Sequence, residues 1–144
     1  MQFAKTREVK SPQRAHDTDV GIDFFVPEDF KTVKLNKGDS VLIPSGIKVN
    51  VPKGYALIAF NKSGVALKKG LMVGACVVDP GYQGEIFINL LKVTGDTVEI
   101  NAGDKIVQFV LLPVVQDNLC LVQESELFSS NTDRGSGGFG STGS

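Results

Sequence analysis

Four short stretches place polar or charged side chains beside apolar runs, where they could bind a ligand or take part in a reaction. The first is "DVGIDFF", in which Asp23 interrupts an apolar strand between Ile22 and Phe24. A carboxylate at such a position must be solvated, paired or close to a cation. A strand-edge aspartate that faces water is the commoner outcome for this stretch taken alone.

The second stretch is "FNKSGVA", which follows an apolar strand that ends at Phe60. Lys62, Ser63 and Gly64 combine a cation, a hydroxyl and a backbone that a ligand can approach closely, at a strand-to-loop junction. This combination suits a phosphate group. An ordinary polar turn has the same composition, so the stretch alone supports both interpretations equally.

The third stretch is "GACVVDPGYQGEIFINL". Asp79, Pro80 and Gly81 fit the first three positions of a β-turn, which is sufficient structural reason for all three. Tyr82 and Gly84 then add a flat phenol and a bare backbone next to the carboxylate. At the tip of a buried hairpin, these groups would form the wall of a small pocket.

The fourth stretch is "GDKIVQFVLL", where Gln108 is an amide within a nearly continuous apolar strand. A buried amide needs hydrogen-bond partners. The backbone of a neighbouring strand is the commoner partner, and a polar ligand or its ordered water is the alternative.

The chain ends in "DRGSGGFGSTGS", residues 133–144, which has little apolar surface to offset the entropy of ordering its glycines. We therefore expect this segment to be flexible. A linker is one interpretation. Arg134, a two-pronged phosphate binder, and Phe139, a flat apolar ring, suggest instead that the segment contacts a ligand.

The elements that must position these residues are strands. "GIKVNVPKG" and "TVEIN" alternate apolar and polar residues, and "SVLIP", "YALIAF", "EIFINLL" and "KIVQFVLLPVV" are longer apolar runs typical of strands buried on both faces. Turn motifs recur every eight to twelve residues or so. Helical periodicity extends to one turn at most, in "GVALKKG". The sequence predicts an all-β fold, a jelly roll or similar double sheet of short antiparallel strands.

Composition limits the function further. The chain has 144 residues, enough for one domain with a proper core, and 15 Lys plus Arg against 16 Asp plus Glu. This balance favours neither nucleic acid nor a membrane surface as a partner, so a phosphate site must be built locally. His16, the single histidine, excludes a multi-histidine metal site. Cys76 and Cys120 lie in apolar runs, which predicts small buried core residues in a reducing cytoplasm.

No apolar run approaches the length of a membrane span, and "MQFAKTREVK" lacks the apolar core of a signal peptide. We expect a soluble cytoplasmic protein that binds neither membranes nor nucleic acid directly.

Taken together and in order, five stretches resemble the five motifs of the homotrimeric dUTPase family. They are "DVGIDFFVP", "NKSGVA", "GACVVDPGYQGEI", "AGDKIVQFVLLPV" and "RGSGGFGSTG", and the resemblance spans Asp19 to Gly143. It implies a dUTPase-like β-barrel and hydrolysis of dUTP to dUMP and pyrophosphate, which keeps uracil out of DNA and supplies dUMP for thymidylate synthesis.

The resemblance also implies residue roles. Asp79 would be the general base that activates water for in-line attack on the α-phosphorus, and Asp23 would hold Mg²⁺ through a coordinated water, as suits a carboxylate and substrate oxygens. Tyr82 would lie against the deoxyribose, and the backbone from Gly74 to Val78 would pair with uracil. The implied substrate-binding residues are Lys62, Ser63, Gly64, Gly74, Val77, Tyr82, Gln108, Arg134, Phe139, Gly140, Ser141 and Thr142.

In the family, three chains share each site: one gives the first, second and fourth motifs, another the third, and another the tail. The resemblance therefore implies a β domain at residues 1–128 and a flexible lid arm at residues 129–144. Arg134, Ser141 and Thr142 would grip the terminal phosphates, and Phe139 would stack on uracil. Closure of such an arm expels water from the reaction.

Three residues depart from the commonest family pattern. Asn61 replaces proline, Lys62 replaces arginine, and Cys76 replaces glycine. Lysine keeps the charge but loses the planar, two-pronged grip of arginine. A side chain at position 76 affects how closely the backbone can approach the base.

Two other functions are consistent with such a fold. A dCTP deaminase needs a further glutamate that acts on the pyrimidine, and Glu85 is the nearby candidate. A non-catalytic trimeric module that recognises a protein partner would be marked by loss of Asp23 or Asp79, and both are present.

Overall fold

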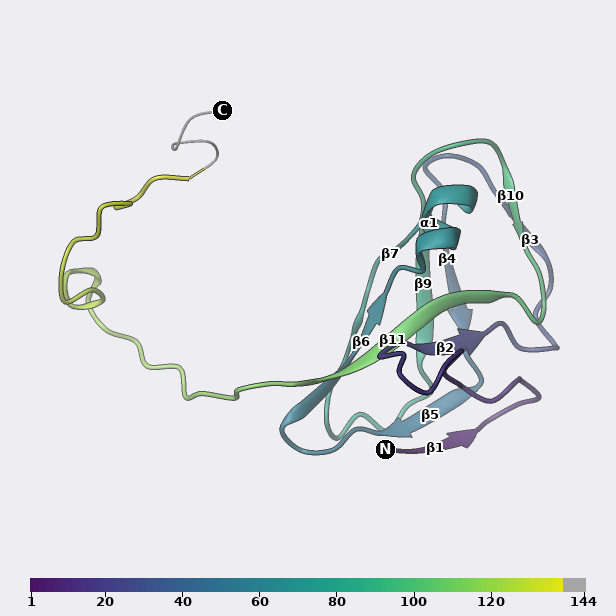
Figure 1. The fold of residues 1–144 in the computed structure, drawn as a ribbon, viewed down its shortest axis with the longest axis horizontal. Helices are drawn as coiled ribbons and strands as arrows, with labels where there is room; N and C mark the ends of the chain where they lie inside the picture. The colour runs from purple at the N-terminus through teal and green to yellow at the C-terminus, as the bar shows by residue number, and fades with distance from the viewer. Residues whose placement is uncertain (139–144) are drawn as a thin grey trace.

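Short antiparallel strands make up most of the regular structure of residues 1–138, the part of the chain that the computed structural model describes (Figure 1). The strands are β1 (Gln2–Lys5), β2 (Ile22–Phe25), β3 (Val33–Leu35), β4 (Ser40–Pro44), β5 (Ile47–Asn50), β6 (Tyr55–Phe60), β7 (Leu71–Val73), β8 (Val77–Val78), β9 (Phe87–Lys92), β10 (Val98–Ile100) and β11 (Lys105–Pro113). This confirms the predicted all-β fold.

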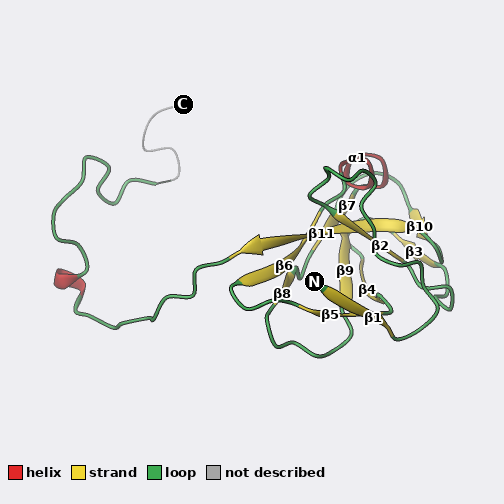
Figure 2. Cartoon of the chain, turned by 60° about the horizontal axis from the view of Figure 1, so that its bottom comes forward, coloured by secondary structure: helices red, strands yellow, loops and turns green. Residues whose placement is uncertain are grey.

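Two larger sheets enclose the core, and Figure 2 shows their strands around it. One sheet has the strand order β2-β11-β6-β8 and the other has the order β4-β9-β7. The pairs β1-β5 and β3-β10 complete the strand region, and every pairing is antiparallel. The predicted double sheet is therefore present.

The burial of the strands follows their sequence alternation. In β5, Ile47 and Val49 face the core while Lys48 and Asn50 face outward. The prediction that the long apolar runs are buried on both faces holds for parts of β6 and β11, where consecutive residues such as Ala56 and Leu57 are buried, and is wrong for β4 and β9, which pack on the core with one face. Leu42 in β4 is 59% exposed, for example.

A short helix, α1 (Ser63–Lys69), follows β6 directly, where the sequence predicts one turn at most. It ends at Gly70, whose φ of +59° is left-handed and whose missing side chain leaves room for the Thr94 carbonyl. Buried Lys92 donates to the carbonyl oxygens of Lys69 (2.8 Å) and Thr94 (2.6 Å), which binds the helix end to β9.

The chain leaves the strand region after Pro113, as Figure 1 shows, and residues 114–138 contain only the 3₁₀ turn η1 (Glu124–Glu126). Cys120 is exposed here, so its predicted burial is wrong: no sheet covers this segment. Cys76 is half-buried against the core, and both thiols are free. The boundary at residue 128 remains a prediction.

Among residues 1–138, no helix is both long enough and apolar enough to cross a membrane.

Asp23 is one of the few buried charged side chains, with 4% of its side chain exposed. Its Oδ1 accepts a hydrogen bond from Lys62 Nζ, and its Oδ2 accepts one from Lys105 Nζ at 2.9 Å. Burial disfavours the charged form and is the largest single influence on the pKa of Asp23. The hydrogen bonds and charges of the two lysines together outweigh it and hold that pKa below its usual range.

The pKa of Asp23 is lower in the folded than in the unfolded chain. Its ion pairs therefore stabilise the fold at pH values above the unfolded-state pKa of about 3.9. This contribution to the free energy of unfolding is lost as the pH falls through the folded-state pKa. We predict that Asp23→Asn lowers the free energy of unfolding at pH 7 and that its deficit relative to the wild type shrinks towards pH 3. Urea unfolding at several pH values measures this. A deficit that is independent of pH would contradict it.

Candidate active site

The first group of predicted site residues gathers around Asp23, which the structure pairs with cations rather than exposing to water. Lys62 reaches Asp23 from the residue just before α1, and Lys105 reaches it from the start of β11. A register shift between Lys105 and Val107, typical of a β-bulge, changes which way the strand presents its side chains. We call Asp23, Lys62 and Lys105 the lysine–aspartate cluster.

Gln108 lies beside this cluster, directly opposite Asp23 in the pairing of β11 with β2. It is half-buried, and its Nε2 donates to the Asn61 carbonyl at 2.9 Å, the backbone partner that the sequence predicts as commoner. Gly21 is required here, because a Cβ at that position would lie 2.2 Å from Gln108 Oε1. The glycine of "DVGID" thus makes room for the amide.

Ser63 and Gly64 begin α1, so the predicted strand-to-loop junction is a strand-to-helix junction. Both residues are exposed, and the space beside Gly64 is open: a Cβ there would have no atom within 4 Å. The structure therefore brings Asp23, Lys62, Ser63, Gly64 and Gln108 to the same end of β6 and β11. Together with Lys105, these residues offer a ligand two ammonium groups, a hydroxyl, an amide and an accessible backbone.

The second group of predicted residues lines a pocket of about 220 Å³. This is below the roughly 300–1,000 Å³ of sites for drug-sized ligands, and it suits one small ring. Its walls are mostly apolar, with the Asp79 carboxylate and the Tyr82 phenol as polar groups. The lining residues are Ala75, Cys76, Val77, Val78, Asp79, Tyr82, Ile86, Phe87 and Phe109.

The turn that carries Asp79 is the predicted β-turn: Tyr82 N–H donates to the Asp79 carbonyl at 3.3 Å, and Gly81 has a φ of +87°. Asp79 is exposed at the pocket. Tyr82 is 46% exposed and donates its hydroxyl to the Glu85 carbonyl at 2.8 Å. A Cβ at Gly84 would lie 2.3 Å from that hydroxyl oxygen, so glycine is needed for the ring to lie there.

The predicted hairpin at this turn is wrong. The turn joins β8 to β9, but β8 pairs with β6 in the four-stranded sheet, whereas β9 lies between β4 and β7 in the other sheet. Residues 79–84 thus carry the chain from one sheet to the other, and the pocket lies beside this crossing.

Within one chain, Asp79 lies far from the lysine–aspartate cluster. Val78 pairs with Leu57, near the start of β6, whereas Gln108, opposite Asp23, pairs with Phe60 at its end. The two aspartates are separated by three strand spacings across the sheet and about four residues along it, which places their backbones roughly 20 Å apart. They cannot act on the same atom from one chain.

Asp23 fits the weak protein contact that Mg²⁺ usually makes beside bound phosphates. Among the described residues, no three His, Cys, Asp or Glu side chains lie close enough to form a metal site. Magnesium is commonly held by one or two carboxylates together with substrate phosphates and several waters. A single carboxylate beside two ammonium groups that could bind phosphate matches that donor set, so Asp23 is the residue that would meet the ion's hydration shell.

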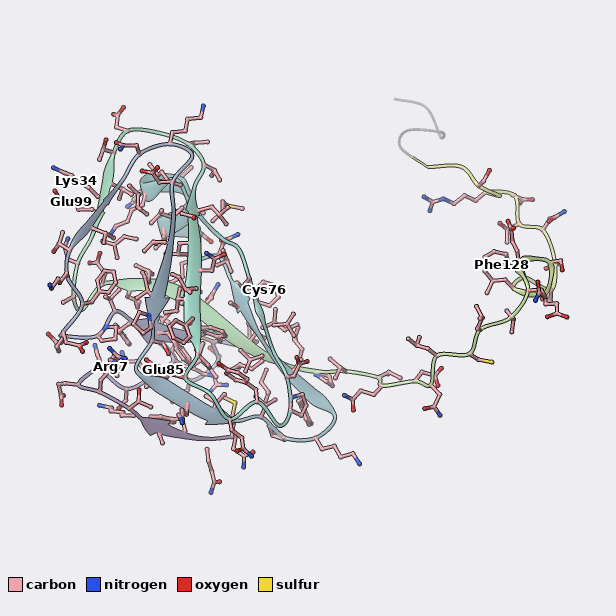
Figure 3. The ribbon with its side chains drawn as sticks, turned by 180° about the vertical axis from the view of Figure 1, so that it is seen from behind. Arg7, Lys34, Cys76, Glu85, Glu99 and Phe128 are labelled. Carbon is pink, nitrogen blue, oxygen red and sulfur yellow. The ribbon has the colours of Figure 1, made fainter. Side chains whose placement is uncertain are left out.

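Glu85 cannot serve as the catalytic glutamate of a deaminase in this conformation. Its Oε2 is paired with Arg7 at 3.2 Å, and its Oε1 accepts the Gly46 N–H at 2.6 Å. Figure 3 shows Arg7 and Glu85 next to each other. Its side chain is 15% exposed and is not among the residues that line the pocket.

Arg134 is exposed in the C-terminal segment, where its Nε donates to the Gly137 carbonyl at 3.1 Å. Figure 3 shows Phe128 of the same segment well away from the strand region. The structure therefore does not bring Arg134 to either group of site residues of its own chain. Phe139, Gly140, Ser141 and Thr142 lie outside the described residues.

Lys105 is a site residue that the sequence-based prediction missed. The sequence signal for it is a basic residue at the start of a buried strand, three positions before Gln108. Strand alternation alone would have placed the two side chains on opposite faces. Only the register shift in β11 brings the Lys105 ammonium to Asp23.

Comparison with known proteins shows the family of the chain. The family model described as dUTPase matches residues 7–143. Deoxyuridine 5'-triphosphate nucleotidohydrolase of Clostridium tetani is 38% identical over 138 residues, which cover 94% of this chain and 90% of the relative. The Bdellovibrio bacteriovorus protein of the same name is 41% identical over 113 residues, covering 77% and 73%.

Solved structures match the fold of this chain over most of its length. A mutant dUTPase of Staphylococcus bacteriophage 80alpha, solved with dUpNHpp, superposes with a TM-score of 0.86 at 27% identity over 99% of this chain and 98% of the phage protein. A mutant dUTPase of S. aureus phage phi11, whose structure reveals coordination of a structural Mg(II) ion, has a TM-score of 0.77 at 28% identity over 90% and 98%. On the match of sequence and fold over nearly its whole length, this chain belongs to the dUTPase family.

Proposed function

We propose that the chain hydrolyses dUTP to dUMP and pyrophosphate. The observation that carries this proposal is the exposed Asp79 carboxylate at a pocket for one ring, beside Tyr82, in a chain of the dUTPase family. In a cell, this reaction would keep uracil out of DNA and supply dUMP for thymidylate synthesis.

Asp79 is the general base of the proposed reaction. It accepts a proton from a water molecule, whose oxygen attacks the α-phosphorus in line with the leaving group. The bond from the α-phosphorus to the bridging oxygen breaks, and pyrophosphate leaves with that electron pair. The solvent exposure of Asp79 gives water access to the carboxylate.

Lys62, Ser63, Gly64 and Gln108 bind the phosphates in this proposal. The positive charge of Lys62 and the open backbone at Gly64 suit the negative charge that develops on the phosphate oxygens. Mg²⁺ held near Asp23 would neutralise further phosphate charge when bound. Lys105 can keep its ion pair with Asp23 when Lys62 turns to a phosphate, because the two lysines use different oxygens.

In this proposal, the pocket of about 220 Å³ binds the base and selects uracil. The backbone from Gly74 to Val78, including Val77, pairs with the uracil edge, and Tyr82 packs against the deoxyribose and leaves no room for a 2′-hydroxyl. A 5-methyl or an exocyclic amine is rejected by shape and by the hydrogen-bonding groups it leaves unpaired. The phage 80alpha protein, solved with dUpNHpp, supports this substrate class.

A complete site needs a second copy of the chain, and we propose a homotrimer with shared sites. The distance of roughly 20 Å between the backbones of Asp23 and Asp79 supports this, because a base and a metal-binding acid must act at the same phosphate. The outer face of the β4-β9-β7 sheet carries exposed apolar side chains that a second copy could cover. They are Leu42, Met72, Phe87 and Leu91.

The C-terminal arm, residues 129–144, completes the proposed site. Arg134 would bind the terminal phosphates together with Ser141 and Thr142, and Phe139 and Gly140 would cover the uracil. The extended course of residues 114–138 away from the strand region supports an arm that can reach a neighbouring chain (Figure 1).

Release of pyrophosphate tests the proposed reaction. We expect Mg²⁺-dependent release from dUTP and little from dTTP, dCTP or UTP. Asp79→Asn keeps the shape of the side chain but removes its basicity, so turnover should fall on the order of 10²-fold or more while dUTP still binds. Near-normal turnover of this variant would rule out Asp79 as the base.

Mixing two inactive variants tests the shared site. Asp23→Asn chains keep Asp79, and Asp79→Asn chains keep Asp23, so mixed trimers regain intact sites where the two meet. Equal amounts, unfolded and refolded together, should recover up to about one quarter of wild-type activity, the share of sites that random assembly makes intact. Asp23→Asn chains mixed with the double variant are the control and should stay inactive. No recovery in the first mixture would contradict sharing.

Truncation tests the arm. A chain that ends at Asp133 should keep its strands and its oligomeric state, since the exposed segment contributes little to the core. Its turnover should collapse, because Arg134 and the glycine amides no longer stabilise phosphate charge. Circular dichroism, light scattering and pyrophosphate release measure the three properties. A truncated protein with normal turnover would show that the arm is only a linker.

A further inference from the structure

Residues 73–76 cross from one sheet to the other and lead into the pocket. Val73 ends β7, at the edge of the β4-β9-β7 sheet, and Val77 begins β8, in the four-stranded sheet. Backbone groups in such a crossing have no continuous strand as a partner and must find hydrogen bonds elsewhere. Ala75 and Cys76 already line the pocket, so the conformation of this crossing sets the shape of its wall.

Two asparagines supply the missing partners for three consecutive amides. Asn61 Oδ1 accepts the Val73 N–H at 2.7 Å. The Asn89 carbonyl accepts the Gly74 N–H at 3.0 Å, and Asn89 Oδ1 accepts the Ala75 N–H at 3.1 Å. We call Asn61 and Asn89 the asparagine clamp.

Each asparagine of the clamp is also bound to one of the two sheets, Asn61 through its backbone carbonyl and Asn89 through its side chain. Asn61 follows β6 of the four-stranded sheet, and its carbonyl accepts the Gln108 side chain. Asn89 lies in β9 of the other sheet, and its Nδ2 donates to the Val41 carbonyl at 3.2 Å. The crossing is thus fixed with respect to both sheets.

The clamp also accounts for Gly74. A Cβ at that position would lie 2.0 Å from Asn89 Oδ1, so any larger residue would displace the asparagine side chain. The position of the Asn89 side chain therefore requires glycine at position 74.

We propose that Asn61 and Asn89 are positioning residues for pyrimidine recognition: they hold residues 73–75 so that the following backbone presents its hydrogen-bonding groups to the base. This rests on the proposed function. Neither side chain lines the pocket, so both act through the backbone they hold. In Asn61 the chain carries an acceptor where the family commonly has proline, which has no such side chain.

Leucine and aspartate substitutions separate this role from simple packing. Asn61→Leu and Asn89→Leu keep approximate size but remove the acceptor, whereas Asn61→Asp and Asn89→Asp keep an acceptor oxygen. Loss of base binding that is equal in ground and transition states raises KM and leaves kcat unchanged. We expect the leucine variants to raise KM for dUTP and Kd for dUMP about 10-fold, with kcat within about twofold of wild type, and to lower the preference for dUTP over dCTP.

Amide hydrogen exchange gives a direct structural measurement. The Val73 amide should exchange faster in Asn61→Leu, and the Ala75 amide should do so in Asn89→Leu. Asn61→Asp should restore both protection and KM, whereas Asn89→Asp also loses the hydrogen bond to the Val41 carbonyl and should restore neither fully. Asn50→Leu, at an exposed position of β5, is the matched control and should leave all these values unchanged.

Two outcomes would overturn the proposal. One is fast exchange at Val73 and Ala75 with unchanged KM, dUMP affinity and dUTP preference, since the held conformation would then not matter for the base. The other is that Asn61→Asp, which keeps the acceptor oxygen for the Val73 amide, is as impaired as Asn61→Leu. Failure of the proposed function is distinguishable, because the wild type would then release no pyrophosphate from dUTP and would not bind dUMP.

Discussion

The placement of a buried carboxylate in β2 is the constraint on which the proposed phosphate-binding side of the structure depends. Asp23 cannot remain charged beside Phe24 without partners, and the two lysines that pair with it come from the residue before α1 and from the start of β11. Their ion pairs therefore link the junction of β6 with α1 and the start of β11 to β2. The same charges that stabilise the carboxylate are the charges that a triphosphate needs, so stability and binding share one set of residues.

A second constraint acts on the proposed base-binding side, where the chain changes sheets twice. Residues 73–76 and 79–84 carry the backbone between the two sheets, and the pocket lies between these crossings. Backbone that leaves a strand exposes its amides and carbonyls, which makes it suitable for recognising a flat polar ring but hard to hold in place. The side-chain amides of Asn61 and Asn89 and the hydroxyl of Tyr82 replace the missing strand partners. Gly74 and Gly84 leave room for the Asn89 and Tyr82 side chains.

Residue types predicted the features of this structure that depend only on neighbours in sequence. The alternation in β5 and the turn at Asp79 followed from residue types within a few positions. The rest depended on partners distant in sequence. Asp23 was expected to face water because Lys62 and Lys105 lie 39 and 82 positions away, and the expected hairpin failed because each of its strands has a better partner in a different sheet. The roles of the site residues came from the family resemblance rather than from residue types alone.

The exposed apolar groups support the proposal that a second chain completes the site. The core is fully formed by inward-facing side chains, yet Leu42 and Phe87 on the strands and Leu119 in the C-terminal segment face solvent. Apolar surface of this kind costs free energy until something covers it. Because the proposed base, Asp79, and the proposed metal-binding acid, Asp23, lie near opposite ends of β6, association that buries this surface would bring the base of one chain to the acid of another. Catalysis would then depend on the same burial that stabilises the assembly.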